Sequence, residues 1–136
     1  MPVAVWSDQY ETGIVEIDAQ HQNLFRVIND LAERCKMGQA ASGAYEALDF
    51  LNEYTEAHFH TEEEFMRVLG YPMLSFHQVE HTALLTKVQN LRVKMDEGFM
   101  ITADVASFVA DWLAHHINEA DMAYVHYLKE KLAHLQ

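Results

Sequence analysis

The amino-acid sequence predicts an all-α fold, an antiparallel up-down four-helix bundle with an N-terminal arm and a short C-terminal helical extension. Its 136 residues are the size of one domain. Five glycines and two prolines are few for an all-β fold with many tight turns. Apolar residues recur at three- and four-residue steps in four segments separated by short breaks. We expect one domain over residues 1–136, with an arm over about 1–16, a bundle over about 17–120 and an extension over about 121–136.

The arm is expected to run from Met1 to about Val15, with turn-forming residues and no helical periodicity. The first helix is then predicted from about Asp18, whose side chain suits an N-cap, to Met37, before Gly38. Its apolar face consists of Ile17, His21, Leu24, Phe25, Ile28, Leu31 and Cys35.

The second helix is predicted from about Ser42 to Leu69, where Gly70, Tyr71 and Pro72 end it. The third follows Pro72 and runs to about Glu97, before Gly98. The inner face of the second helix holds Leu48, Leu51, Thr55, His58, Glu62, Phe65 and Leu69, and that of the third holds Leu74, His77, His81, Leu84, Val88, Leu91 and Met95.

The fourth helix is predicted to begin near Thr102 and to continue, or restart, through Tyr124 and Leu132. Its apolar face consists of Val105, Phe108, Val109, Trp112, Leu113, His116 and Ile117. Short connections between four amphipathic helices indicate that consecutive helices pack side by side in opposite directions.

Composition excludes several classes of function. A formal net charge of -12 argues against binding of nucleic acid or of an anionic membrane surface, because both need a basic face. The single cysteine, Cys35, excludes an intramolecular disulfide framework and a multi-cysteine metal site. The N-terminus lacks a signal-peptide pattern, and the apolar runs are too short to span a bilayer. We therefore expect a soluble cytoplasmic protein, a monomer rather than an oligomer.

Six histidine and glutamate residues fall on the predicted inner faces, where a dry core should have none. They are His21, His58, Glu62, His77, His81 and His116. Two of these histidines have close duplicates. Periodicity turns His58 inward and His60 toward water, and it turns His116 inward and His115 toward water.

Each inward histidine taken alone is more often a hydrogen-bonded core residue than a ligand, and Glu62 near a helix end could reach solvent. Together they favour a metal site in the bundle interior. Five imidazoles with carboxylates exceed the four ligands of structural zinc and suit two iron ions. The Glu-x-x-His spacing of ferritin-like di-iron proteins is absent from the sequence. A nitrogen-rich site of this kind favours binding and release of O2 over oxidation of a substrate.

The same residues lie in stretches that resemble hemerythrin, in particular the single-domain bacterial hemerythrins. The resemblance extends from Trp6 to about Tyr124. It is carried by Gly13-Ile14, Ile17 to Phe25, His58 to Glu63, Tyr71-Pro72, the pair His77 and His81, Trp112 to Ile117, and Asp121.

The resemblance implies two irons in the bundle. It implies that His77, His81 and His116 bind one iron and that His21 and His58 bind the other. Glu62 and Asp121 would bridge the two ions together with an oxo or hydroxo group, and O2 would bind at the iron with two histidines. Asp121 is five residues after His116, about 140° around a regular helix. We therefore expect a wide turn or break within Ile117–Asp121.

The function expected from this resemblance is reversible O2 binding by a carrier, store or delivery protein rather than an enzyme. Phe59, Trp112, Leu113 and Ile117 are the candidate walls of the O2 pocket, because they lie beside the expected ligands. The alternatives are an O2 or redox sensor, or a di-iron enzyme with oxidase, peroxidase or NO-handling activity. An oxygen-consuming enzyme with a basic surface is the partner that the acidic charge would permit.

Overall fold

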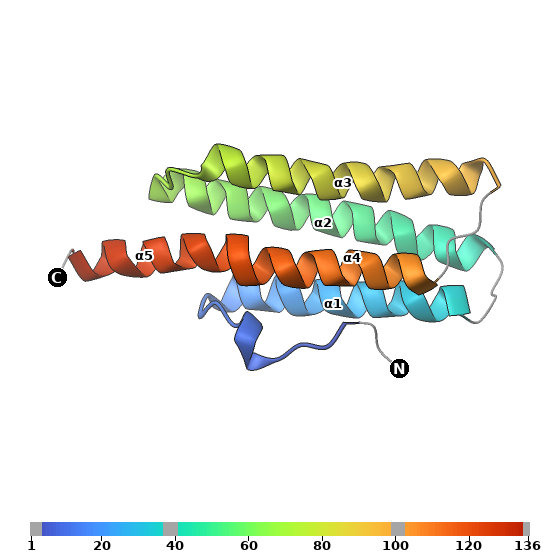
Figure 1. Cartoon of the computed structure of the whole chain (residues 1–136), viewed down its shortest axis with the longest axis horizontal. Coiled ribbons are helices and arrows are strands. Elements are labelled where there is room, and N and C mark those ends of the chain that lie inside the picture. The colour runs from blue at the N-terminus through green and yellow to red at the C-terminus, as the bar shows by residue number, and fades with distance from the viewer. Residues whose placement is uncertain (1–3, 37–40, 99–102, 135–136) are drawn as a thin grey trace.

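Four long helices run alternately in opposite directions along one axis, as the sequence predicts (Figure 1). The computed structural model describes residues 4–36, 41–98 and 103–134, so the boundaries predicted at Met37, Gly38 and Thr102 lie outside the described residues. The elements of the bundle are α1 (Val15–Lys36), α2 (Ala41–Leu69), α3 (Leu74–Asp96), α4 (Ala103–His116), a π-helix η2 (Ile117–Asp121) and α5 (Met122–His134).

The helices bury apolar stripes against one another. Helix α1 lies against both α2 and α4, and α2 lies against α3. The main core spans all four helices, and a smaller cluster of Met66, Tyr124 and Val125 lies where α2 meets α5. Along α2, the buried residues change from Leu48 and Leu51 to polar side chains and then to Met66. The polar layer is therefore enclosed by apolar side chains at both ends.

The N-terminal arm folds back along α1 and carries a short 3-10 turn, η1 (Asp8–Tyr10) (Figure 1). The rings of Trp6 and Tyr10 pack edge-on against Phe25, with centroids 5.5 and 5.2 Å from it. The backbone of Ala4 exchanges two hydrogen bonds with the Asn29 side chain, at 2.9 and 2.8 Å. These contacts attach the arm to the outer side of α1.

Helix α1 begins at Val15, three residues before the predicted N-cap Asp18. Asp18 lies inside the first turn, where its carboxylate accepts hydrogen bonds from the backbone and hydroxyl of Thr12, both at 2.8 Å, and from the backbone of Gly13 at 3.2 Å. The prediction of an N-cap was therefore wrong, because this acid binds the loop before the helix rather than the first free amides of the helix.

The turn between α2 and α3 has the expected glycine. Gly70 adopts a φ of +75°, and its amide bonds to the carbonyl of Arg67 at 3.1 Å. The next amide, of Tyr71, bonds to the carbonyl of Met66 at 3.0 Å. This pair of bonds is the Schellman ending of a helix, which needs a left-handed residue that only glycine adopts without strain.

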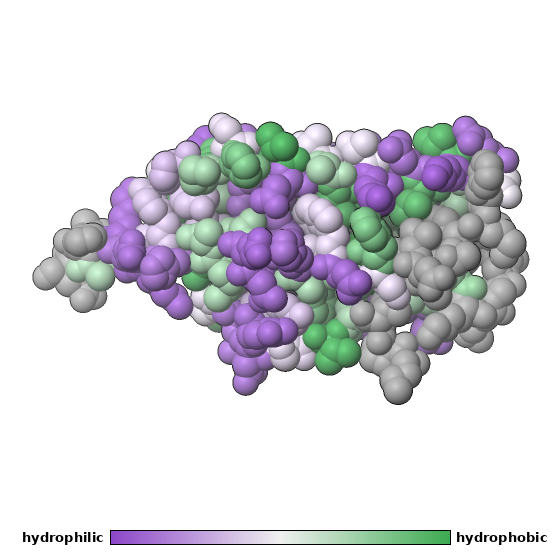
Figure 2. Space-filling model, viewed as in Figure 1, coloured by the Kyte–Doolittle hydropathy of each residue, from purple (hydrophilic) through white to green (hydrophobic). Residues whose placement is uncertain are grey.

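The surface is mixed in character. On the face shown in Figure 2, hydrophilic residues cover much of the α4 and α5 side, and hydrophobic residues appear in small groups. Among the described residues, none of the helices is both long enough and apolar enough to cross a lipid bilayer.

Candidate metal centre

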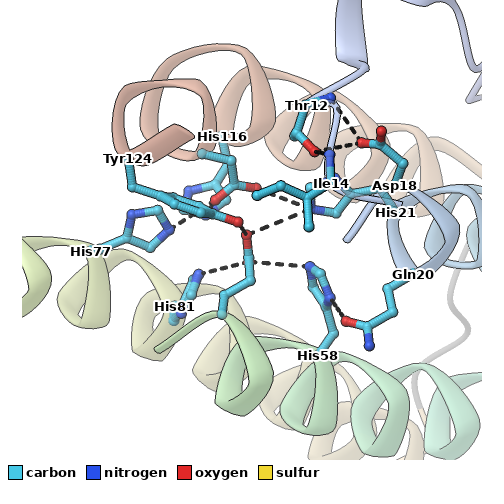
Figure 3. Close-up of polar contacts among 12 residues, drawn as sticks. Thr12, Ile14, Asp18, Gln20, His21, His58, His77, His81, His116 and Tyr124 are labelled. Carbon is cyan, nitrogen blue, oxygen red and sulfur yellow. Dashed lines mark hydrogen bonds and ion pairs between the residues drawn. The ribbon is translucent and has the colours of Figure 1, made fainter. Parts of the chain in front are cut away.

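Five histidines and two carboxylates meet inside the bundle at 0–3% exposure (Figure 3). They come from every long helix: His21 from α1, His58 and Glu62 from α2, His77 and His81 from α3, His116 from α4, and Asp121 from η2. These are the seven residues that the sequence and the resemblance predict. The fold places all of them in one polar layer.

Helical spacing accounts for the pairs within each helix. His58 and Glu62 are four residues apart on α2, and His77 and His81 are four apart on α3. Residues at that spacing lie one above the other on the same face of a helix. Each of these helices therefore directs two candidate ligands at the same depth of the core.

The ligand atoms form two groups that share Glu62. One contains His77, His81 and His116, called here the three-histidine group, together with Glu62 and Asp121. The other contains His21 and His58, the two-histidine group, with Glu62. Within each group, the atoms that could bind a metal lie within 4.8 Å of one another.

The two carboxylates lie between these groups. Oδ1 of Asp121 is 2.9 Å from Nε2 of His77 and 3.2 Å from Nε2 of His116, and Oδ2 is 3.1 Å from Nε2 of His21. Asp121 thus presents one oxygen to each group.

Glu62 makes the corresponding contacts from the opposite helix. Its Oε1 is 3.1 Å from Nε2 of His58 and 3.5 Å from Nε2 of His81, one histidine from each group. Glu62 and Asp121 therefore both contact imidazoles of the two groups.

The atoms that face this shared space have no hydrogen-bond partner within the described part of the chain. They are Nε2 of all five histidines, Oε1 of Glu62 and both carboxylate oxygens of Asp121. Buried polar atoms without partners are costly, and so many directed at one point need a ligand to satisfy them. Imidazole nitrogens and carboxylate oxygens are donors that suit iron, so the residues fit a di-iron centre.

Both carboxylates are held in the charged form. Burial acts to raise the pKa of Asp121, but His116, His21 and His77 hold it well below its usual range. Burial and Asp121 likewise act to raise the pKa of Glu62, and His58 and His81 lower it to about 2. Two buried anions side by side provide the negative charge that a pair of cations requires.

The backbone between His116 and Asp121 departs from α-helical geometry. Residues Ile117–Asp121 form a π-helix, which confirms the wide turn expected there. The extra residue in this turn brings His116 and Asp121 to the same side, and both side chains are buried. Glu119, which regular spacing would favour as the ligand, is exposed on the surface beside His115.

The duplicate histidines separate as periodicity predicts. His58 and His116 are each 2% exposed, whereas His60 and His115 lie at the surface. The side chain of His115 is 71% exposed and contacts Glu119 at 3.1 Å.

Three residues beside the ligands were missed by the sequence analysis. Oε1 of Gln20 is 2.5 Å from Nδ1 of His58, and Oε2 of Glu63 is 2.8 Å from Nδ1 of His81. The buried hydroxyl of Tyr124 donates a hydrogen bond to Oε2 of Glu62 at 2.8 Å. Because these partners lie 18 to 62 residues apart in the sequence, no local pattern could have found them.

Two of the four predicted pocket walls stack on ligand histidines, and the other two are buried in the main core. The Phe59 ring stacks on that of His81 with centroids 3.7 Å apart, and the Trp112 ring stacks on that of His116 at 4.8 Å. Leu113 and Ile117 are 1% and 0% exposed in the main core. Three of these residues are fully buried, and Trp112 is partly buried.

A family model described as the hemerythrin HHE cation binding domain matches residues 12–128. Among similar proteins, the bacteriohemerythrin of Stenotrophomonas maltophilia (strain R551-3) is 34% identical over 133 residues, which cover 97% of this chain and 86% of that protein. The bacteriohemerythrin of Clostridium acetobutylicum is 33% identical over 127 residues, which cover 89% of this chain and 98% of that protein.

Solved structures share the fold. The crystal structure of a wild-type hemerythrin matches with a TM-score of 0.84 at 31% identity, over 88% of this chain and 93% of that one. A leucine-to-alanine variant of hemerythrin matches with a TM-score of 0.87 at 30% identity, over 91% of this chain and 95% of that one.

Proposed function

Because the chain belongs to the hemerythrin family, whose members bind a di-iron centre, we propose that it binds O2 reversibly as a carrier, store or delivery protein. The observation that carries the proposal is the convergence of buried ligand atoms into two groups that share Glu62, with Asp121 contacting histidines of both. Imidazole nitrogens and carboxylate oxygens so directed at one space are a donor set that suits iron.

In this proposal, His77, His81 and His116 would hold one iron and His21 and His58 the other, with Glu62 and Asp121 available to both. When bound, a ferrous pair supplies the redox chemistry by which O2 is taken up and released. The two-histidine group offers one imidazole fewer, which leaves room for O2 on that side.

The other residues of the site orient the ligands and exclude water. Gln20 accepts a hydrogen bond from Nδ1 of His58, and Glu63 accepts one from Nδ1 of His81. Each contact orients the imidazole so that its Nε2 faces the centre. Phe59, Leu113 and Ile117 are the proposed apolar walls of the O2 pocket, with Trp112 stacked at its edge. Water at such a site would promote oxidation of the iron, so buried apolar walls favour reversibility.

The test is repeated oxygenation. Protein loaded anaerobically with ferrous iron should develop a visible absorption band in air, lose it under vacuum or argon, and regain it over several cycles. A band that appears once and cannot be removed would contradict the carrier proposal. That outcome would favour the sensor or enzyme alternatives instead.

A further inference from the structure

Two ligand imidazoles bind side chains of different charge through their outer nitrogen. Nδ1 of His81 donates to Oε2 of Glu63 at 2.8 Å, and Nδ1 of His58 donates to Oε1 of Gln20 at 2.5 Å (Figure 3 shows the latter). Donation from Nδ1 leaves Nε2 unprotonated and directed into the centre, the form that binds a metal. The two contacts fix the same tautomer, but one acceptor is an anion and the other is a neutral amide.

The Glu63 carboxylate is held by both oxygens. Its Oε1 accepts a hydrogen bond from Nε2 of Gln78 at 3.1 Å, and its side chain is 24% exposed. A second carboxylate faces the same group, because Oε1 of Glu80 is 3.7 Å from Nδ1 of His116. That distance is too long for a hydrogen bond but short enough for the charge to act.

Among the described residues, neither Nδ1 atom of the two-histidine group makes a hydrogen bond to a carboxylate. Its His58 binds the Gln20 amide, and Nδ1 of His21 is buried without a partner. The acid one turn before His21 is Asp18, whose two oxygens accept hydrogen bonds from Thr12 and Gly13, so it acts on His21 through its charge and not through a hydrogen bond. Over the residues that the structure describes, a carboxylate hydrogen-bonded to Nδ1 of a ligand imidazole is thus found only in the three-histidine group, while Glu62 and Asp121 contact Nε2 atoms of both groups.

We propose that Glu63, opposed by the neutral Gln20, makes the two iron positions electronically unequal and favours the ferric state at the three-histidine group. The inference rests on the proposed di-iron function. An anionic acceptor at Nδ1 makes the imidazole a stronger donor at Nε2, and a stronger donor stabilises the more highly charged ion. Glu63 and Gln20 are positioning residues in this scheme, since neither contacts the space that the metals would occupy.

The experiment exchanges the two acceptors without removing either hydrogen bond. Glu63→Gln deletes the charge beside His81 and retains an amide oxygen that can accept. Gln20→Glu adds a charge beside His58. Glu64→Gln is the matched control, because it removes the same charge from the next residue of α2, whose side chain pairs with Arg67 at the surface.

The measurements are the iron content per chain and the reduction potential of the iron-loaded protein by spectroelectrochemical titration. We expect the potential to rise in Glu63→Gln, to fall in Gln20→Glu, and to stay near the wild-type value in Glu64→Gln. Equal potentials in Glu63→Gln and Glu64→Gln, with two irons retained in both, would overturn the proposal.

If Glu63→Gln loses its iron, Gln20→Glu decides alone: a lower potential supports the proposal, and an unchanged or higher one overturns it. Loss of iron from both variants also overturns it, since the outer residues would then only hold the ligands in place. Oxygen cycling of the same samples tests the proposed function separately. If wild-type protein retains two irons but does not bind O2 reversibly, the proposed function is contradicted. The reduction potentials of the variants still test the inference about Glu63 and Gln20.

Discussion

Histidines two residues apart on one helix have different environments in this protein. His58 is 2% exposed in the centre, and His60 lies at the surface of the same helix. The difference follows from the angle between successive side chains on a helix, about 100° per residue. His115 and His116 differ for the same reason.

This contrast predicts unequal effects of paired substitutions. His58→Ala and His116→Ala should abolish O2 binding, because each deletes an inward imidazole and leaves buried carboxylates without a partner. His60→Ala and His115→Ala should bind O2 normally and change stability by less than about 0.5 kcal/mol. Iron analysis and oxygen cycling measure the effect, and equal damage from both members of either pair would refute the assignment of faces.

Leu113 is the residue whose size should decide how long the oxygenated protein lasts. It is 1% exposed and lies three residues before His116, on the same face of α4. Leu113→Ala should retain two irons and oxidise in air several-fold faster, because the cavity left behind can admit water beside polar groups. The rate of decay of the oxygenated absorption band measures the effect.

The control is Leu48→Ala, another fully buried leucine, ten residues or about 15 Å along α2 from His58. Leu48→Ala, like Leu113→Ala, should lower the free energy of unfolding by roughly 2–5 kcal/mol, but it should leave the oxidation rate unchanged. If both variants oxidise at the wild-type rate with iron intact, Leu113 is not part of the water barrier.

At the scale of elements, the π-helix is what allows two consecutive helices to serve one site. Regular α-helical geometry over Ile117–Asp121 would direct Asp121 away from His116. One wide turn corrects this, and α5 then continues with Tyr124 and Val125 buried in the smaller apolar cluster. The same turn thus sets the position of a ligand and the packing of the helix after it.

The junction between the arm and α1 depends on one acid. Asp18→Ala removes the acceptor of three hydrogen bonds from Thr12 and Gly13 and should lower the free energy of unfolding by about 1.5–3 kcal/mol. Glu16→Ala is the control, since Glu16 is an exposed acid of the same first turn and should change stability by less than about 0.5 kcal/mol. Urea unfolding of both variants in the same metal-loaded state measures their free energies of unfolding. An equal loss of free energy in both variants would show that the negative charge at the helix start matters and the hydrogen bonds do not.

At the scale of the whole molecule, the imidazole and carboxylate atoms of the candidate centre lie in the core of the bundle, where side chains are normally apolar. Within the described part of the chain, those that face the shared space have no hydrogen-bond partner and contact only one another, so a bound cation would satisfy them. Apolar clusters on either side of the polar layer shield it from water. Metal binding and bundle stability should therefore be linked.

Loading with ferrous iron should reach two ions per chain and raise the temperature of unfolding. Each site adds about 2.7 kcal/mol when the free metal is at a hundred times its dissociation constant. Anaerobic metal analysis and calorimetry before and after chelation provide the measurement. A stoichiometry of one ion, or a preference for zinc when iron is abundant, would contradict the di-iron assignment.

The sequence alone determined the helices, most of their inner faces and five inward histidines with Glu62, because a helix repeats every 3.6 residues and so assigns each residue an angle about its own axis. Phe108, predicted on the inner face of the fourth helix, is 49% exposed, so that prediction was wrong. Asp121 needed the family resemblance, since the π-turn that places it changes that angle. Only the tertiary structure decided that Glu63 binds His81, that Gln20 binds His58 and that Tyr124 binds Glu62. Periodicity gives the direction of a side chain around its own helix. It does not give the residue of the neighbouring helix that lies opposite, or the charge of that residue.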